Sequence, residues 1–168
     1  MNRALPAVRL RVPTDEDAVA WHRVFDDPAV MEFHGGRSAE LSFYEELTAR
    51  QRRHDAELGF CLWTMLDASD RVIGFTGAQP WPREWGPVGE IEIGWRLGRE
   101  FWGQGYATAA AGVTLERVRS AGVPSVVAMV MAGNSRSVAV TRRLGMRLTD
   151  VYTTPSRNEE GHCYRLDL

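Results

Sequence analysis

Hydrophobic and polar residues alternate along residues 89–97, and this is the clearest periodic pattern in the chain. Successive side chains of a strand point to opposite faces, so the alternation predicts a β-strand with one apolar face. The apolar set is Ile91, Ile93, Trp95 and Leu97, and the opposite set is Glu90, Glu92, Gly94 and Arg96. This strand therefore places two carboxylates on one side of a predicted sheet.

Further segments have the apolar and aromatic content of strands: residues 9–12, 59–67, 71–78, 123–131, 146–152 and 162–168. Residues 68–70 predict a hairpin between two of them. The three prolines of residues 79–87 are expected to keep that segment out of a central strand. The near-continuous apolar run at 123–131 is typical of a buried, parallel strand.

About four helices are expected between the strands. Thr14 is the predicted N-cap of the first helix, which stops near residues 27–28. Ser38 is the predicted N-cap of the second, which ends in the polar residues 50–54. Residues 106–120 form the third, and the fourth runs from an Asn134 cap to Gly145. This order predicts an α/β (mixed α+β) fold, mainly antiparallel at first and with a β-α-β crossover later, in one domain over residues 1–168.

The composition is that of an ordinary folded domain. Of 168 residues, 44% are hydrophobic and 25% are charged, with a formal net charge of −2. These values argue against disorder and against a basic field that would recruit nucleic acid or an anionic membrane. No apolar run approaches the ~20 residues of a membrane span, and we expect no signal peptide. Two cysteines and four histidines lack paired spacing, which predicts a cytoplasmic protein without a metal site.

All 20 basic residues are arginine, and the chain has no lysine. A Walker-type phosphate loop, a Schiff-base enzyme and a lysine general base each need the amine that lysine supplies. The sequence therefore excludes these three classes of chemistry.

Residues 97–111 join the alternating strand to the third helix through Gly103 and Gly105. Glycines let the backbone turn sharply, and the first amides of a helix are unpaired and favour an anion such as a pyrophosphate. Two other interpretations stay open from these residues alone. One is a plain tight turn, and the other is a dinucleotide-binding fingerprint, which Thr108 at its sixth position disfavours.

Residues 102–107, Trp-Gly-Gln-Gly-Tyr-Ala, together with their surroundings resemble the GNAT superfamily of N-acetyltransferases. The superfamily carries Q/R-x-x-G-x-G/A between a strand and a helix. Trp at the first position is similar to the F-W-G-x-G-Y-A-T wording of the ribosomal-protein N-terminal acetyltransferases. Residues 134–137 with 143–146 resemble the N-x-x-S and K-L-G-F/M helix of that subgroup, and residues 90–95 resemble its E-I/L-G-Y strand. With the opening segments, the resemblance covers nearly the whole chain.

The resemblance implies a mostly antiparallel, seven-stranded sheet that opens in a V between residues 89–97 and 123–131. Acetyl-CoA would lie in that opening, with its pyrophosphate on the backbone amides of the glycine turn and its arm near Asn134. Arg99 would be a weaker phosphate contact. The implied cofactor-binding residues are Leu97, Arg99, Gly103, Gln104, Gly105, Tyr106, Ala107, Thr108 and Asn134.

An amine attacks a thioester only when it is neutral, so a carboxylate at the reaction end is needed to accept a proton. Glu92 lies where the resembled strand places such a group, and a like charge on Glu90 would raise its pKa. A salt bridge to Arg96 or a solvated strand face is the alternative interpretation of Glu92. Many superfamily members carry a general-acid Tyr at the position of Thr141, so either the CoA thiol leaves without an acid or Ser137 is the candidate acid.

The acceptor is expected to be a primary amine, either a small molecule or a protein N-terminus. His34 belongs to a segment that lines the acceptor side in related folds, and Trp81 and Trp85 form a stiff aromatic loop before the candidate strand. Glu90 is a further candidate contact. We expect an acetyl-CoA-dependent N-acetyltransferase, with a homodimer as a candidate assembly. The alternatives are a CoA-binding protein of the same fold that has lost its chemistry and, less favoured, a dinucleotide-dependent oxidoreductase.

Overall fold

The computed structural model describes residues 4–168, and its centre is one seven-stranded sheet. The strands are β1 (Arg9–Arg11), β2 (Leu62–Leu66), β3 (Val72–Pro80), β4 (Ile91–Leu97), β5 (Ser125–Met131), β6 (Arg147–Thr153) and β7 (Glu160–Asp167). They lie in the order β1-β2-β3-β4-β5-β7-β6. Only the β4–β5 pair is parallel among these neighbours, which confirms the mixed and mostly antiparallel sheet.

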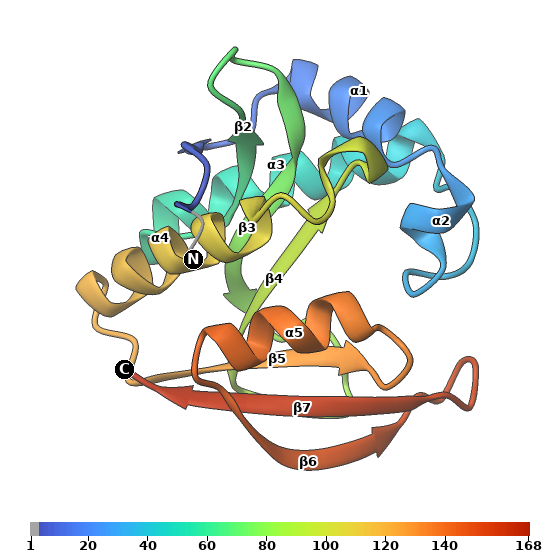
Figure 1. Cartoon of the computed structure of the whole chain (residues 1–168), viewed down its shortest axis with the longest axis vertical. Coiled ribbons are helices and arrows are strands. Elements are labelled where there is room, and N and C mark those ends of the chain that lie inside the picture. Colours follow the sequence, from blue (N-terminus) through green and yellow to red (C-terminus); the bar gives the residue numbers. More distant parts are fainter. Residues whose placement is uncertain (1–3) are drawn as a thin grey trace.

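Five α-helices cover the sheet: α1 (Asp15–Val24), α2 (Pro28–Met31), α3 (Leu41–Leu58), α4 (Tyr106–Ser120) and α5 (Ser135–Arg143). Figure 1 shows α4 and α5 in front of the sheet, with α3 behind it. The core divides in the same way. One buried cluster joins α4 to β1–β5, and the other joins α1, α2 and α3 to Leu62 and Phe75 on the opposite face.

The two halves of the sheet separate at β4 and β5. Their ladder contains a single pair, Glu92 with Val127, and beyond that pair the strands diverge toward their carboxyl ends. Figure 1 shows β2–β4 running across the direction of β5–β7. The expected V is therefore present, and Glu92 lies at its apex.

Five local expectations were wrong or incomplete. The structure has a fifth helix, α2, because Pro28 is preset for a first helical turn and Asp27 caps it by accepting the Ala29 N–H at 2.8 Å. A 3₁₀ turn at Arg99–Phe101 was also not foreseen. The N-cap of α3 is Glu40, since the Ser38 hydroxyl donates to Asp26 instead, at 2.6 Å.

The helix α3 continues through the polar residues 50–54 and ends only at Leu58. Strand β3 likewise includes Gln79 and Pro80, which pair with Glu92 and Ile91. Proline is tolerated there because the ladder with β2 has already ended at Gly77. At Pro80 the strand pairs with a neighbour on one side only. This extension places the Gln79 side chain beside Glu92.

The predicted Thr14 cap is confirmed, and the Thr14 N–H donates to Asp17 Oδ2 at 2.8 Å. In residues 4–168 no helix combines the length and the apolar character needed to cross a membrane.

Candidate active site

The glycine turn leads from the 3₁₀ turn into α4 and has the backbone that the sequence predicted. Gly103 and Gly105 have φ of +70° and +93°, a left-handed region that side chains disfavour. Gly105 is the N-cap of α4 and supplies no side chain to cap it. The first N–H groups of α4 therefore stay free to bind an anion.

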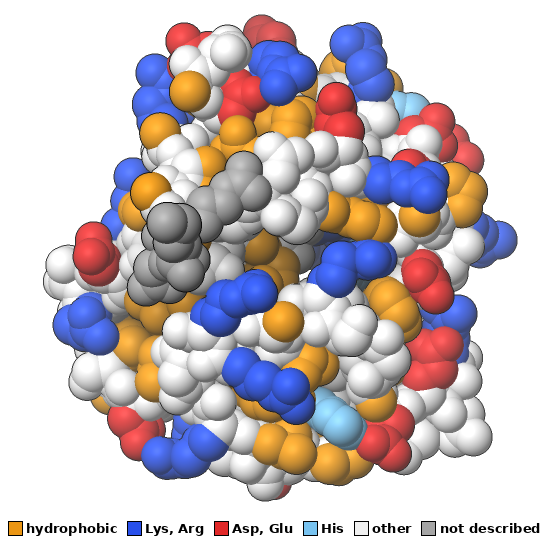
Figure 2. Space-filling model, viewed as in Figure 1, with side chains coloured by type: hydrophobic (Ala, Val, Ile, Leu, Met, Phe, Trp, Pro, Cys, Tyr) orange, Lys and Arg blue, Asp and Glu red, His pale blue; other side chains and the backbone are white. Residues whose placement is uncertain are grey.

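A cavity of about 390 Å³ opens in front of this turn. Figure 2 shows the surface hollowed between the regions of α4 and α5, with basic side chains beside the hollow. Eight of the nine predicted cofactor residues line it: Leu97, Gly103, Gln104, Gly105, Tyr106, Ala107, Thr108 and Asn134.

Arg99, the ninth, does not line the cavity. Its side chain is exposed, and its Nη1 lies 3.9 Å from the Asp27 carboxylate. A phosphate contact from Arg99 stays a prediction.

Two basic residues of α5 line the cavity instead, and the sequence reasoning missed them. The guanidinium of Arg136 lies 3.9 Å from the centre of the Trp102 ring, and Arg143 lies two turns further along the helix. The Trp102 Nε1 in turn donates to the Leu97 carbonyl at 3.1 Å. Arg136 and Arg143 are seven residues apart, so they share one face of the helix that begins after Asn134. This spacing was the signal in the sequence that could have found them.

A smaller hollow of about 100 Å³ continues into the V between β4 and β5. Residues of both strands line it, with His34, Asn134 and Ser137 shared with the larger cavity. Ser137 Oγ accepts a hydrogen bond from Trp95 Nε1 at 3.2 Å, and Asn134 Oδ1 accepts the Ser137 N–H at 3.2 Å. Neither of these two bonds uses the Ser137 hydroxyl proton, which therefore stays available to donate.

Thr141 cannot replace the missing tyrosine. Its side chain is fully buried, and its Oγ1 donates to the Val138 carbonyl at 2.7 Å. The hydroxyl is therefore used in a hydrogen bond within α5, and Thr141 lies outside the lining of both cavities.

Glu92 is half-buried at the apex of the V, outside the lining of the two cavities. Gln79 Nε2 donates to its Oε1 at 2.7 Å, and Gln51 Nε2 donates to Gln79 Oε1 at 2.8 Å. Burial raises the pKa of Glu92 to about 7, although the Gln79 bond and the charges of Arg83 and Arg50 act in the opposite direction.

Two expectations for Glu92 were wrong: the cause of its raised pKa and a salt bridge to Arg96. The Glu90 charge does not raise the pKa of Glu92, because Glu90 is paired with Arg165 at 2.8 and 3.1 Å. That pairing lowers the pKa of Glu90 itself. Within residues 4–168, no salt bridge joins Glu92 to Arg96.

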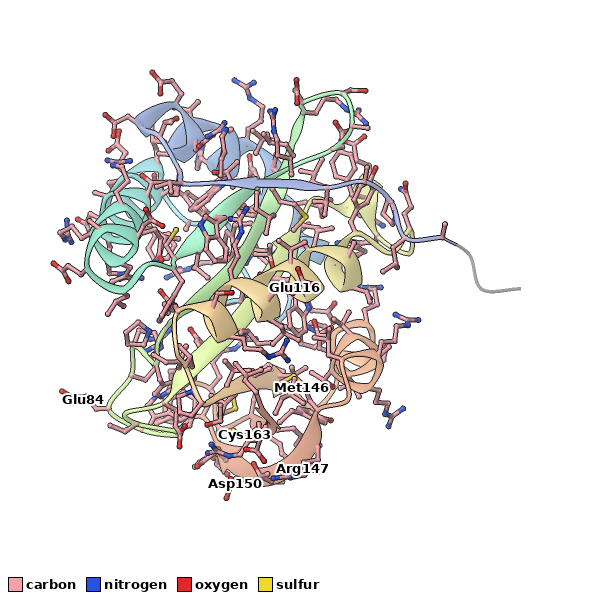
Figure 3. The ribbon with its side chains drawn as sticks, turned by 90° about the vertical axis from the view of Figure 1, so that its left-hand side faces the viewer. Glu84, Glu116, Met146, Arg147, Asp150 and Cys163 are labelled. Atoms are coloured by element: carbon pink, nitrogen blue, oxygen red, sulfur yellow. The ribbon has the colours of Figure 1, made fainter. Side chains whose placement is uncertain are left out.

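The predicted acceptor residues lie on two sides of the site. His34 lines both cavities, and burial together with the nearby Arg96 charge holds the pKa of His34 well below its usual range. Trp81 and Trp85 stack edge-to-face with ring centres 5.5 Å apart, and Trp81 Nε1 donates to the Trp85 carbonyl. Figure 3 shows Glu84, between them in sequence, on the side of the sheet away from α5.

Other chemistries find no support among the described residues. They contain no group of three or more His, Cys, Asp or Glu side chains that could hold a metal ion. Burial raises the pKa of Cys61 to about 12 and also raises that of Cys163, so both thiols stay protonated.

Known proteins share this sequence pattern. Residues 7–147 match the acetyltransferase (GNAT) domain family. The chain is 31% identical over 144 residues to the uncharacterized protein YkkB of Bacillus subtilis, and the match covers 83% of this chain and 81% of YkkB. It is 27% identical over 106 residues to an L-methionine sulfoximine/L-methionine sulfone acetyltransferase of Pseudomonas paraeruginosa, covering 62% of each.

Solved structures share the fold. The structure of yncA from Salmonella typhimurium with its cofactor acetyl-CoA matches with a TM-score of 0.74 at 17% identity, over 96% of this chain and 94% of that one. A ribosomal-protein-alanine N-acetyltransferase from Brucella melitensis matches with a TM-score of 0.75 at 18% identity, over 95% and 99%.

The fold, the glycine turn and these matches define the class. The chain belongs to the GNAT acetyltransferase family. It is an acyl-CoA-dependent acetyltransferase with acetyl-CoA as its donor, and its fold is similar to that of ribosomal-protein acetyltransferases.

Proposed function

We propose that this protein transfers an acetyl group to a primary amine by direct attack, with Glu92 as general base. The observation that carries the proposal is the position of Glu92, which lies at the apex of a V whose mouth joins the glycine-turn cavity. Bound acetyl-CoA supplies a thioester carbonyl to the amine and releases the CoA thiol.

The residues of the large cavity fit a CoA diphosphate. Free amides at the start of α4 and the positive charges of Arg136 and Arg143 complement its negative charge. Asn134 and the edges of β4 and β5 are positioned to hold the arm that leads toward Glu92. These assignments support the proposal.

Glu92 removes a proton from the incoming ammonium group, directly or through one water. A carboxylate with a pKa of about 7 is half ionised at neutral pH and is a stronger base than an ordinary one. Gln79 holds the carboxylate at the apex and leaves Oε2 free, since its bond goes to Oε1. A backbone N–H of the diverging strands meets the charge that develops on the carbonyl oxygen.

Ser137 is the candidate acid for the departing sulfur. Its Oγ accepts from Trp95 Nε1, so its own proton remains available. A CoA thiol is a fair leaving group, and we therefore expect the Ser137→Ala variant to lose less activity than a Glu92 variant.

The test is the rate of CoA thiol release over a panel of amines. Glu92→Gln should keep acetyl-CoA affinity but reduce kcat/KM by roughly 10²- to 10⁴-fold near pH 7. The wild-type kcat/KM should rise with pH through about 7, as Glu92 loses its proton. A near-wild-type rate for Glu92→Gln would overturn the base assignment. Acetyl-CoA binding without thiol release for any amine would instead favour the CoA-binding alternative.

Two acceptor classes follow from the comparisons. The Pseudomonas relative is described as acetylating two amino acids, and the Brucella structural neighbour as acetylating a ribosomal protein. A small amino compound and a protein N-terminus are therefore both candidates for this chain.

A further inference from the structure

Three alternate residues of β4, Glu92, Gly94 and Arg96, face the side of the sheet that α1 and α3 cover. The neighbouring positions on β3 are Gln79, Gly77 and Phe75, in the same order. Both middle positions are glycine, so the face carries a carboxylate at one end, a guanidinium at the other and no side chain between them. A Cβ added at Gly94 would have no atom within 4 Å, so the space above it is open.

Arg96 has no anionic partner. Within residues 4–168, no carboxylate lies within salt-bridge distance of its guanidinium, and its Nε is buried without a hydrogen-bond partner. The guanidinium instead lies 5.3 and 5.2 Å from the ring centres of Phe25 and Phe75. Aromatic faces offset only part of the cost of a buried charge, which an anion would offset further.

The other polar groups around Arg96 do not neutralise it. The Tyr44 hydroxyl interacts with the Arg96 guanidinium, which lowers the pKa of the phenol, but burial raises that pKa by more, so the phenol stays neutral and supplies no negative charge. His34 is also neutral near pH 7, because burial and the Arg96 charge lower its pKa. The positive charge of Arg96 therefore remains unbalanced where it lines the large cavity.

We propose that the acceptor is a free amino acid, whose carboxylate binds Arg96 while its amine faces Glu92 across Gly94. This inference rests on the proposed function, since it takes Glu92 as the base. Residues 92 and 96 of an extended strand are roughly 13 Å apart. The glutamate and arginine side chains together with a small zwitterion can span that distance.

The geometry separates the two acceptor classes. In a protein N-terminus the carboxyl group next to the amine is an amide and carries no charge. A protein N-terminus would therefore bring no anion to Arg96, and its charge would stay unpaired. The face between Glu92 and Arg96 thus favours a free amino acid over a protein N-terminus.

The first experiment measures kcat/KM by thiol release for the free proteinogenic L-amino acids, each beside its own carboxamide. The amine of the carboxamide is less basic and more of it is neutral at pH 7, so amine reactivity alone favours the amide. We expect the best free acid to exceed its amide at least tenfold. Equal or faster turnover of the amides, or turnover only of amines without a carboxylate, would overturn the inference and leave the proposed function intact. No thiol release with any amine would overturn both.

Two variants test the residues. Arg96→Met, which suits the apolar neighbours Phe25, Phe75 and Met31, should collapse the preference for the acid over its amide at least tenfold. Gly94→Ala should raise the acceptor KM at least tenfold without unfolding, because its Cβ meets no atom. Gly112→Ala on α4 is the matched control, since its Cβ also meets nothing and it lies outside both cavities.

Each variant has a contradicting result. An unchanged acid-to-amide ratio in folded Arg96→Met would remove Arg96 from acceptor recognition. An unchanged acceptor KM in Gly94→Ala would place the acceptor elsewhere. If Arg96→Met does not fold, two other measurements still test whether the acceptor is a free amino acid. They are the rates of the wild-type enzyme with each acid and its amide, and the acceptor KM of Gly94→Ala.

Discussion

The Arg136 guanidinium stacks over the Trp102 ring at 3.9 Å, and this contact ties α5 to the segment that enters the glycine turn. Two elements that are more than 30 residues apart in sequence thereby form one continuous part of the cavity lining. Stacking fixes the long arginine side chain before a ligand arrives, so little side-chain entropy is lost on binding.

Arg136→Ala should therefore weaken acetyl-CoA binding about tenfold, which corresponds to ~1.4 kcal/mol for a lost contact to a charged group. Arg142→Ala is the control, because Arg142 is exposed on the same helix and does not line the cavity. Calorimetric titration of both variants measures the difference. Equal affinities would show that Arg136 does not contact the ligand.

Gly103→Ala should reduce acetyl-CoA affinity more than its effect on stability explains. The added Cβ meets no protein atom but enters the lining of the cavity, and the positive φ adds backbone strain. Gly122→Ala has the same kind of strain, at φ +83°, outside the cavity. Both variants should melt earlier than wild type, and only Gly103→Ala should lose the ligand-induced rise in Tm. A full rise in both would contradict the anion cradle.

Gly105 is a less informative position. A Cβ there would come within 3.2 Å of Leu5 and Pro6, so a larger residue would strain the packing of the chain before it touched a ligand. A sequence alone suggests substituting either glycine, whereas the structure distinguishes them.

Glu92→Gln should stabilise the protein at pH 8 more than at pH 4. The folded-state pKa of Glu92, about 7, lies above its ordinary value of 4.5, so the folded state holds this proton more tightly than the unfolded state. Stability is therefore lost as pH rises from about 4.5 through 7, on the order of 1 to 3 kcal/mol. Glutamine does not titrate and lacks this loss. Chemical denaturation of both proteins across this range gives the difference, and a constant difference would refute the raised pKa.

Trp85→Ala should raise the acceptor KM and leave acetyl-CoA affinity within about twofold. The Trp81–Trp85 loop lies outside both cavities and on the side of the sheet away from α5. Steady-state kinetics with each substrate varied in turn separates the two effects. Weaker acetyl-CoA binding with an unchanged acceptor KM would contradict this placement, and a lower Tm alone would show that the tryptophans only cover the sheet.

The regular elements could be predicted because each carries its own periodicity or cap. The alternation of residues 89–97 and the apolar run at 123–131 depend on neighbours in sequence, and both strands were found. The short helix α2 and the Glu40 cap were not, since a four-residue turn has no periodicity. The choice between Ser38 and Glu40 depends on a contact with distant Asp26. The interpretation of residues 1–168 as one domain stays a prediction.

The site was predictable where its chemistry follows the backbone. Glycines before a helix leave its first amides free for an anion, and eight of the nine proposed residues line the cavity. The environment of Glu92 was not predictable, because it depends on Gln79 and Gln51 from two other elements. The isolation of Arg96 was equally hidden, since a sequence does not show which charges lack a partner.

The single ladder pair between β4 and β5 has a further consequence. Past Glu92 and Val127, the facing edges of the two strands have backbone groups that do not pair with each other. Sheet edges normally occur at the rim of a protein, where they invite another chain to add as a strand. Here two such edges lie in the interior of the sheet. An acetyl donor bound in the gap, as proposed above, would shield them, so we expect the ligand-free enzyme to be the form more exposed to self-association.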